Sequence, residues 1–155
     1  MSRNPGNATG VSAAARTVRL LATLVMLAGV VMLVAGAATW FTVRSQLAAE
    51  RITVSDDAVR FAGDKIDGPL TAYTEAETIE RHALKASGGK TYAELGTDDP
   101  ARQTVMTASF LRASLFTSVV SFGVAAMAMG IGVVLGLIGY ALFLVARQLS
   151  AMAAA

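Results

Sequence analysis

The chain has 155 residues, 54% of them hydrophobic, and a formal net charge of +2 at pH 7. With a mean hydropathy of +0.55, it is too apolar for an ordinary soluble domain of this length, which indicates a membrane protein. The absence of cysteine excludes disulfides, zinc–thiolate sites and iron–sulfur clusters, and the scattered basic residues argue against a nucleic acid partner.

The first predicted transmembrane helix covers residues 20–43. Residues 1–15 are small and polar without periodicity, so we expect a disordered cytoplasmic tail over residues 1–19. The following charge-free run, 20–43, is long enough to cross a hydrocarbon core of about 30 Å. Trp40 and Phe41 near its end are typical of the lipid–water boundary. The alternative, a secretory signal cleaved near residues 35–37, would have a shorter apolar run.

Residues 44–99 are polar and predict a small, mainly helical cap outside the cytoplasm. The runs 52–54 and 59–61 favour strands and are separated by a turn sequence, which predicts a short β-hairpin. Between residues 70 and 87, apolar positions recur every three or four residues, as in a helix. Gly88 stands where the C-terminal cap of this helix belongs.

The second long helix is predicted to run from about residue 100 to residue 147. Asp99 and Pro100 form a helix start signal. The charge-free run 113–145 is longer than one span needs, so we expect residues 100–121 outside the bilayer, 122–146 within it and 147–155 in a cytoplasmic tail. The expected fold is all-α: a two-helix transmembrane hairpin with a long second helix and an extracytoplasmic cap.

The distribution of charge predicts the orientation. All eleven acidic residues lie within residues 44–112, whereas the tails carry only basic charge, at Arg3, Arg16, Arg19 and Arg147. The positive-inside bias therefore places both termini in the cytoplasm and residues 44–112 outside the cell membrane.

Small residues recur in both predicted spans, every seven residues in the first and every four in the second. Small side chains let two membrane helices approach closely. The predicted helix-packing interface comprises Ala22, Gly29, Gly36, Ala128, Gly132 and Gly136. These residues favour a seam between the two spans, with a face for a second copy or another membrane protein as the alternative. Neither span contains aspartate, glutamate, lysine, arginine or histidine, which argues against a pump, transporter or channel acting alone.

The string Gly88-Gly89-Lys90-Thr91 resembles part of a phosphate-binding loop. That motif requires a further glycine at position 84, after a strand, but Leu84 stands there within a predicted helix. We therefore predict no nucleotide site. His82 is the only histidine, and with no cysteine beside it we predict no catalytic, cofactor-binding or metal-binding residues.

The phrases "DGPLTAYTEAETIERHALKASGGKTY", residues 67–92, and "SFLR", residues 109–112, carry a resemblance to a known family. From about Arg51 onward the chain resembles a small, uncharacterised family of two-span membrane proteins of actinobacteria, often labelled "aromatic ring-opening dioxygenase". Such enzymes hold non-haem iron with two histidines and a carboxylate. One histidine cannot supply that set, so we interpret the label as a naming error.

The resulting functional prediction is a non-enzymatic integral membrane protein that serves as an interaction or accessory subunit of a membrane or envelope complex. Its expected partners are the lipid bilayer and another membrane protein or a second copy, with no cofactor, nucleotide or nucleic acid. The alternative is an extracytoplasmic protein that binds a small ligand or a cation. A cation would use the carboxylates of Asp56, Asp57, Asp64 and Asp67.

Overall fold

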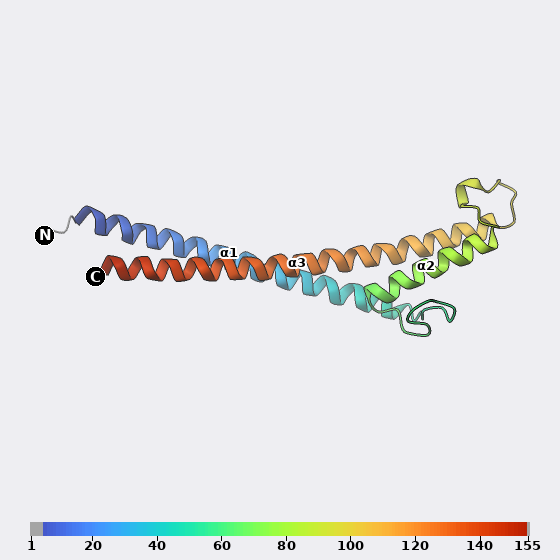
Figure 1. Cartoon of the computed structure of the whole chain (residues 1–155), viewed down its shortest axis with the longest axis horizontal. Coiled ribbons are helices and arrows are strands. Elements are labelled where there is room, and N and C mark those ends of the chain that lie inside the picture. Colours follow the sequence, from blue (N-terminus) through green and yellow to red (C-terminus); the bar gives the residue numbers. More distant parts are fainter. Residues whose placement is uncertain (1–4, 155) are drawn as a thin grey trace. The chain divides into compact units, whose positions relative to one another are not determined.

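The computed structural model describes residues 5–154, and the side chains of residues 10–153. It contains three α-helices, α1 (Pro5–Ala49), α2 (Pro69–Ala86) and α3 (Arg102–Ala154), and the 3₁₀ helix η1 (Tyr92–Glu94) (Figure 1). No strand forms within the described residues. The predicted all-α class is therefore confirmed, and both α1 and α3 are long and apolar enough to cross a membrane.

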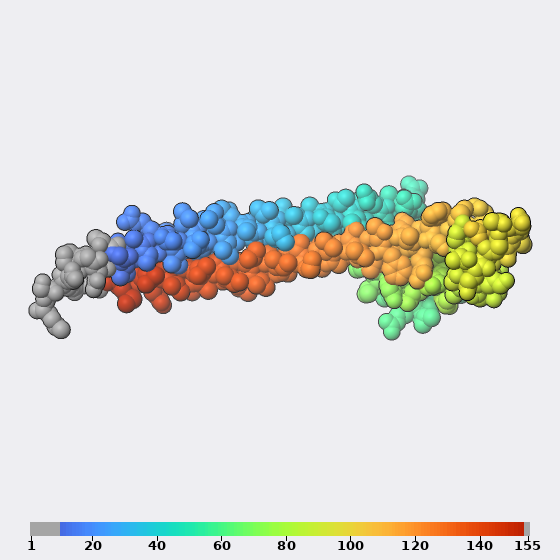
Figure 2. All heavy atoms as spheres, turned by 90° about the horizontal axis from the view of Figure 1, so that it is seen from above, coloured from blue at the N-terminus to red at the C-terminus, as the bar shows by residue number. Residues whose placement is uncertain are grey.

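The chain divides into two compact units, one made of residues 1–37 and 126–155 and the other of residues 38–125. In the first unit α1 and α3 pack side by side, as the blue and red segments of Figure 2 show. The two helices are antiparallel, because Gly29 lies against Gly132 whereas the earlier residue Ala22 lies against the later residue Gly139.

Both long helices extend further than predicted. Helix α1 begins at Pro5 and α3 continues to Ala154, so the prediction of a disordered tail is wrong for residues 5–19, while residues 1–4 lie outside the described part. Proline suits the first turn of a helix, and alanine and arginine in residues 13–16 favour its continuation. Adding residues to an existing helix costs little compared with nucleating a new one.

Helix α2 matches its predicted position closely. At its start, Thr71 Oγ1 accepts from the Gly68 N–H (3.3 Å) and donates to the Gly68 carbonyl (3.1 Å). At its end, Gly88 and Gly89 adopt positive φ angles of 65° and 88°. The Gly89 N–H donates to the Leu84 carbonyl at 2.7 Å, which closes the last turn in the way that glycine permits.

The segment between α1 and α2 contains one isolated antiparallel bridge, Thr53 with Lys65. The predicted pairing of 52–54 with 59–61 is thus wrong. Val54 and Ile66 are 1% exposed and anchor the segment in the core, whereas Val59 is 86% exposed. Residues 59–61 have the higher strand propensity, but pairing with residues 64–66 is favoured because it buries Ile66 in the core.

The core of the second unit contains residues from α1, α2 and α3 and from the segment between α1 and α2. Phe122 of α3 is 1% exposed and makes an edge-to-face contact with Trp40 of α1, with ring centroids 4.7 Å apart. The aromatic pair adds about 1 kcal/mol to the free energy of burial. Around this pair the buried residues are Leu47, Val54, Ile66, Ala72, Ala76 and Leu115.

The loop after α2 is held at the start of α3. Asp99 accepts from the Ala101 N–H at 2.9 Å, so it provides the predicted start signal. The Arg102 guanidinium lies 4.1 Å from the centroid of the Tyr92 ring and donates to the Leu95 carbonyl. These contacts tie η1 to the first turn of α3.

Candidate functional site

The seam of the first unit follows a seven-residue repeat of small residues on each helix. The buried positions are Ala15, Ala22, Gly29 and Gly36 on α1, and Gly132, Gly139 and Ala146 along α3. Of the six residues predicted for helix packing, Ala22, Gly29, Gly36 and Gly132 are buried, and Ala128 and Gly136 are half-buried. Gly139 was not predicted, because the GxxxG spacing in α3 indicates a stripe that recurs every four residues. The buried residues of α3 instead recur every seven residues, as they do in α1.

Three glycines at this seam, Gly29, Gly132 and Gly139, have no room for a side chain, whereas a Cβ atom on Gly136 would meet nothing within 4 Å. A Cβ atom on Gly29 would lie 2.8 Å from the Gly132 carbonyl oxygen, and one on Gly132 would lie 2.7 Å from the Gly29 carbonyl oxygen. A Cβ on Gly139 would meet Ala22 O and Met26 N at 3.0 Å. Such close backbone packing provides the van der Waals contact that holds helices together where no hydrophobic drive exists.

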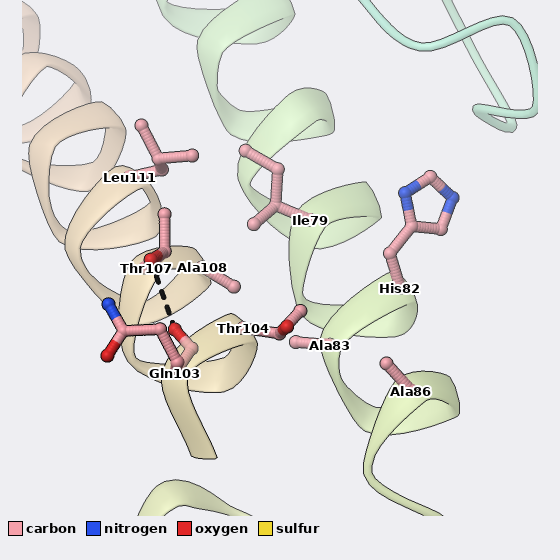
Figure 3. Close-up of a pocket in the computed structure, with 9 residues that line it drawn as sticks. All are labelled: Ile79, His82, Ala83, Ala86, Gln103, Thr104, Thr107, Ala108 and Leu111. Atoms are coloured by element: carbon pink, nitrogen blue, oxygen red, sulfur yellow. Dashed lines mark hydrogen bonds between the residues drawn. The ribbon is translucent and has the colours of Figure 1, made fainter. Parts of the chain in front are cut away.

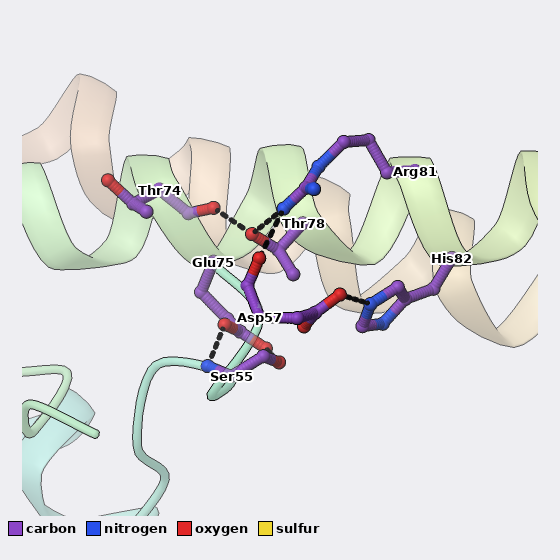
Figure 4. Close-up of polar contacts among 7 residues, drawn as sticks. All are labelled: Ser55, Asp57, Thr74, Glu75, Thr78, Arg81 and His82. Atoms are coloured by element: carbon purple, nitrogen blue, oxygen red, sulfur yellow. Dashed lines mark hydrogen bonds and ion pairs between the residues drawn. The ribbon is translucent and has the colours of Figure 1, made fainter. Parts of the chain in front are cut away.

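A cluster of polar contacts fastens residues 55–57 to α2 (Figure 4). Glu75 is 8% exposed, and its carboxylate accepts from the Ser55 N–H (2.7 Å) and the Ser55 hydroxyl (2.9 Å). Buried carboxylates require such partners, because leaving one unpaired is costly. We call the contacts made by Ser55, Asp57, Glu75, Arg81 and His82 the loop latch.

The second half of the loop latch is an exposed ion pair. His82 Nε2 lies 2.7 Å from Asp57 Oδ2, and Arg81 donates to Thr78 Oγ1 at 3.0 Å. The hydrogen bond from His82 holds the pKa of the Asp57 carboxyl below its ordinary value of 3.8. In η1, outside the loop latch, hydrogen bonds from Thr91 likewise lower the pKa of Glu94.

The latch is not arranged as a catalytic triad. A hydrolytic triad requires histidine between a carboxylate and a nucleophilic hydroxyl. Here the hydroxyl of Ser55 donates to Glu75, while His82 pairs with Asp57. The geometry therefore serves to hold a loop against a helix.

The carboxylates considered for a cation are separated by their own partners. Asp57 pairs with His82, and Asp67 with Arg44 at 2.7 Å. Within residues 10–153, whose side chains are described, no three histidine, aspartate or glutamate side chains come together as a metal site would require. In the string that resembles a phosphate-binding loop, the Gly89 N–H is likewise already used, because it donates to the Leu84 carbonyl and closes the end of α2.

A groove of about 560 Å³ lies between α2 and α3 in the second unit. Its lining comes from Ile79, His82, Ala83, Ala86, Gln103, Thr104, Thr107, Ala108 and Leu111 (Figure 3). The space exists because alanine and threonine side chains are too short to fill it. His82 points away from α3 toward the loop latch, so the groove itself is mostly apolar.

These features define an all-helical protein with two potential membrane-spanning helices and a folded polar unit. No family model, curated protein or solved structure matches the chain. The resemblance to the actinobacterial family therefore stays a prediction that rests on the quoted sequence phrases.

Proposed function

We propose that the protein is a two-pass integral membrane protein that acts as an accessory subunit by binding another membrane protein, with residues 44–112 outside the cytoplasm. The observation that supports the partner is the apolar groove between α2 and α3. The polar lining residues on α3 are Gln103, Thr104 and Thr107, and the Thr107 hydroxyl donates to the Gln103 carbonyl of its own helix.

The membrane placement rests on which side chains the first unit exposes. Large apolar residues point outward along both helices, for example Leu24 (55% exposed), Val31 (65%) and Leu137 (65%). Only 17% of the most apolar window of α1 and 11% of that of α3 are buried, whereas the core helix of a soluble protein would be mostly buried. Small residues inside and large apolar residues outside are the arrangement expected in lipid.

The second unit exposes apolar side chains that a solvated domain has no need to expose. In the groove lining Leu111 is 52% exposed, and its neighbour in sequence, Phe110, is 68% exposed. An open groove between two helices suits an amphipathic helix, which would place its apolar face against Ile79 and Leu111.

The test is crosslinking combined with blocking of the groove. A photo-reactive residue at Thr107, which lines the groove, should capture a membrane protein, whereas one at the exposed Thr117 further along α3 should not. The substitution Ala86→Trp fills the groove and should abolish this crosslink, because an indole would occupy the space. Lys85→Trp adds the same side chain at an exposed neighbour outside the groove and should leave the crosslink unchanged. Equal effects of the two substitutions would contradict the proposal.

The alternative, cation binding by Asp56, Asp57, Asp64 and Asp67, has no comparable support, because Asp57 and Asp67 are already paired with basic side chains. The same reasoning favours a non-enzymatic role, since the latch residues are used to hold the loop.

A further inference from the structure

A pocket of about 320 Å³ lies in the first unit where the apolar parts of both helices end. Its lining consists of Arg19 from α1 and Phe143, Ala146, Arg147 and Ser150 from α3. Two arginines from different helices thus face one cavity. We propose that this pocket binds the phosphate headgroup of an anionic phospholipid, an inference that rests on the membrane placement proposed above.

The first argument is the position of the guanidinium groups. The Arg19 guanidinium lies over the Phe143 ring, 5.5 Å from its centroid. A guanidinium held by its face keeps its N–H donors at the edge, where they can reach a phosphate in the bidentate manner that arginine favours. Arg147 follows Phe143 by one helical turn, about 6 Å along the axis, so both cations line the same short stretch of the pocket.

The second argument is that no acidic side chain of this unit neutralises the arginines. The sequence has no aspartate or glutamate before Glu50 and none after Asp99. In the described part of the chain, Arg147 forms no ion pair. The Ser150 hydroxyl donates to the Ala146 carbonyl at 2.9 Å, which leaves the two arginines as the main donors to a ligand.

The third argument distinguishes a lipid from a free phosphate ion. Exposed apolar side chains continue from the pocket along both helices: Leu20 (62% exposed) and Leu21 (49%) follow Arg19, and Leu144 (41%) and Val145 (46%) precede Arg147. A phospholipid would place its phosphate between the arginines and its acyl chains along this apolar surface. Basic pockets between membrane helices are recognised as headgroup sites for this reason.

The test uses the full chain purified in a mild detergent, with native mass spectrometry to count bound phosphatidylglycerol and phosphatidylcholine. The wild-type protein should retain phosphatidylglycerol in preference. The variant Arg19→Gln/Arg147→Gln should lose this preference, by about fivefold for each arginine removed. Arg147→Gln alone, which breaks no ion pair with any described residue, should lose about fivefold and covers the case in which the double variant fails to fold.

The control is Arg16→Gln, which removes one positive charge from α1, three residues before Arg19 and outside the pocket lining. It should keep the preference. A preference that survives in Arg147→Gln, or that falls equally in Arg16→Gln, would overturn the proposal in favour of general attraction by positive charge. Displacement of phosphatidylglycerol by inorganic phosphate at similar concentration would also overturn it, because the acyl chains would then add nothing.

Alkaline carbonate extraction of membranes from cells that express the protein separates the lipid-site proposal from the membrane placement on which it rests. A protein that leaves the membrane pellet would contradict the membrane placement and the lipid site together. A protein that stays in the pellet, yet shows no lipid preference dependent on Arg147, would contradict the lipid site alone.

Discussion

Gly132 illustrates how a single missing side chain determines the contact between α1 and α3. Its backbone is buried, and the atoms that face it are the carbonyl oxygen of Gly29 and the amide nitrogen of Leu33, which would lie 2.7 and 2.9 Å from a Cβ atom at this position. Backbone atoms cannot rotate away as a side chain can, so a methyl group here must push the helices apart.

We expect Gly132→Ala to destabilise the packing of α1 and α3 by roughly 1–3 kcal/mol through overpacking. Gly130→Ala is the control, because a Cβ at that exposed glycine meets nothing within 4 Å and alanine favours the helix. Unfolding in a denaturing detergent, followed by circular dichroism, measures both. Equal stability of the two variants would show that the seam tolerates a methyl group.

The pair Asp57 and His82 predicts a dependence on pH. Since the hydrogen bond from His82 lowers the pKa of folded Asp57, the ionised carboxylate stabilises the fold above the ordinary pKa of 3.8, and this stabilisation is lost as pH falls through the lowered pKa. We expect His82→Ala to raise the pKa of Asp57 toward 3.8. NMR titration of labelled aspartate carboxyl carbons checks this, with Lys85→Ala as a control that removes a cation three residues along α2 from His82 but not the hydrogen bond.

Among the elements, α2 begins and ends where its own sequence dictates, whereas the loop latch determines which segment packs against it. Thr71, Gly88 and Gly89 act within one turn of the chain, which is why its limits could be predicted. The contact between Glu75 and Ser55 joins residues 20 positions apart, and no local pattern indicates it. The same holds for Arg112, whose guanidinium pairs with Glu80 at 2.8 Å and so ties α3 to α2.

We expect Glu75→Ala to release the segment between α1 and α2, because the Ser55 N–H and hydroxyl lose their acceptor at a cost of about 1–3 kcal/mol. Limited trypsin digestion should then cleave faster after Arg51, Arg60 and Lys65. Glu77→Ala removes an exposed carboxylate of the same helix and should leave the rate of cleavage unchanged. A segment that stays equally resistant in both variants would mean that Val54 and Ile66 alone hold it.

At the scale of the whole molecule, the orientation in the membrane can be tested directly because the chain contains no cysteine. Single cysteines at Lys85, which is exposed outside the groove, and at Ala151 report on the central segment and the C-terminus. A membrane-impermeant maleimide applied to intact cells should label Lys85→Cys, while Ala151→Cys should react only after the membrane is permeabilised. Labelling of Ala151→Cys in intact cells would contradict the proposed cytoplasmic terminus.

The sequence by itself determined the features that depend on composition and on short spacings. The two apolar runs predicted the long helices, and Gly88 predicted where α2 ends. The seven-residue repeat of Ala22, Gly29 and Gly36 predicted the buried face of α1. Each of these follows from the chemistry of a few neighbouring residues, so no knowledge of distant contacts was needed.

Only the tertiary structure decided which distant residues meet. The partner of 52–54 proved to be the run around Lys65, because burial of Ile66 outweighed the strand propensity of 59–61. The pairing of Asp57 with His82, the groove between α2 and α3 and the approach of Arg19 to Phe143 each join separate elements. Such contacts depend on how the helices pack against each other, and the pattern of residues along a single sequence does not show which positions of two helices will meet.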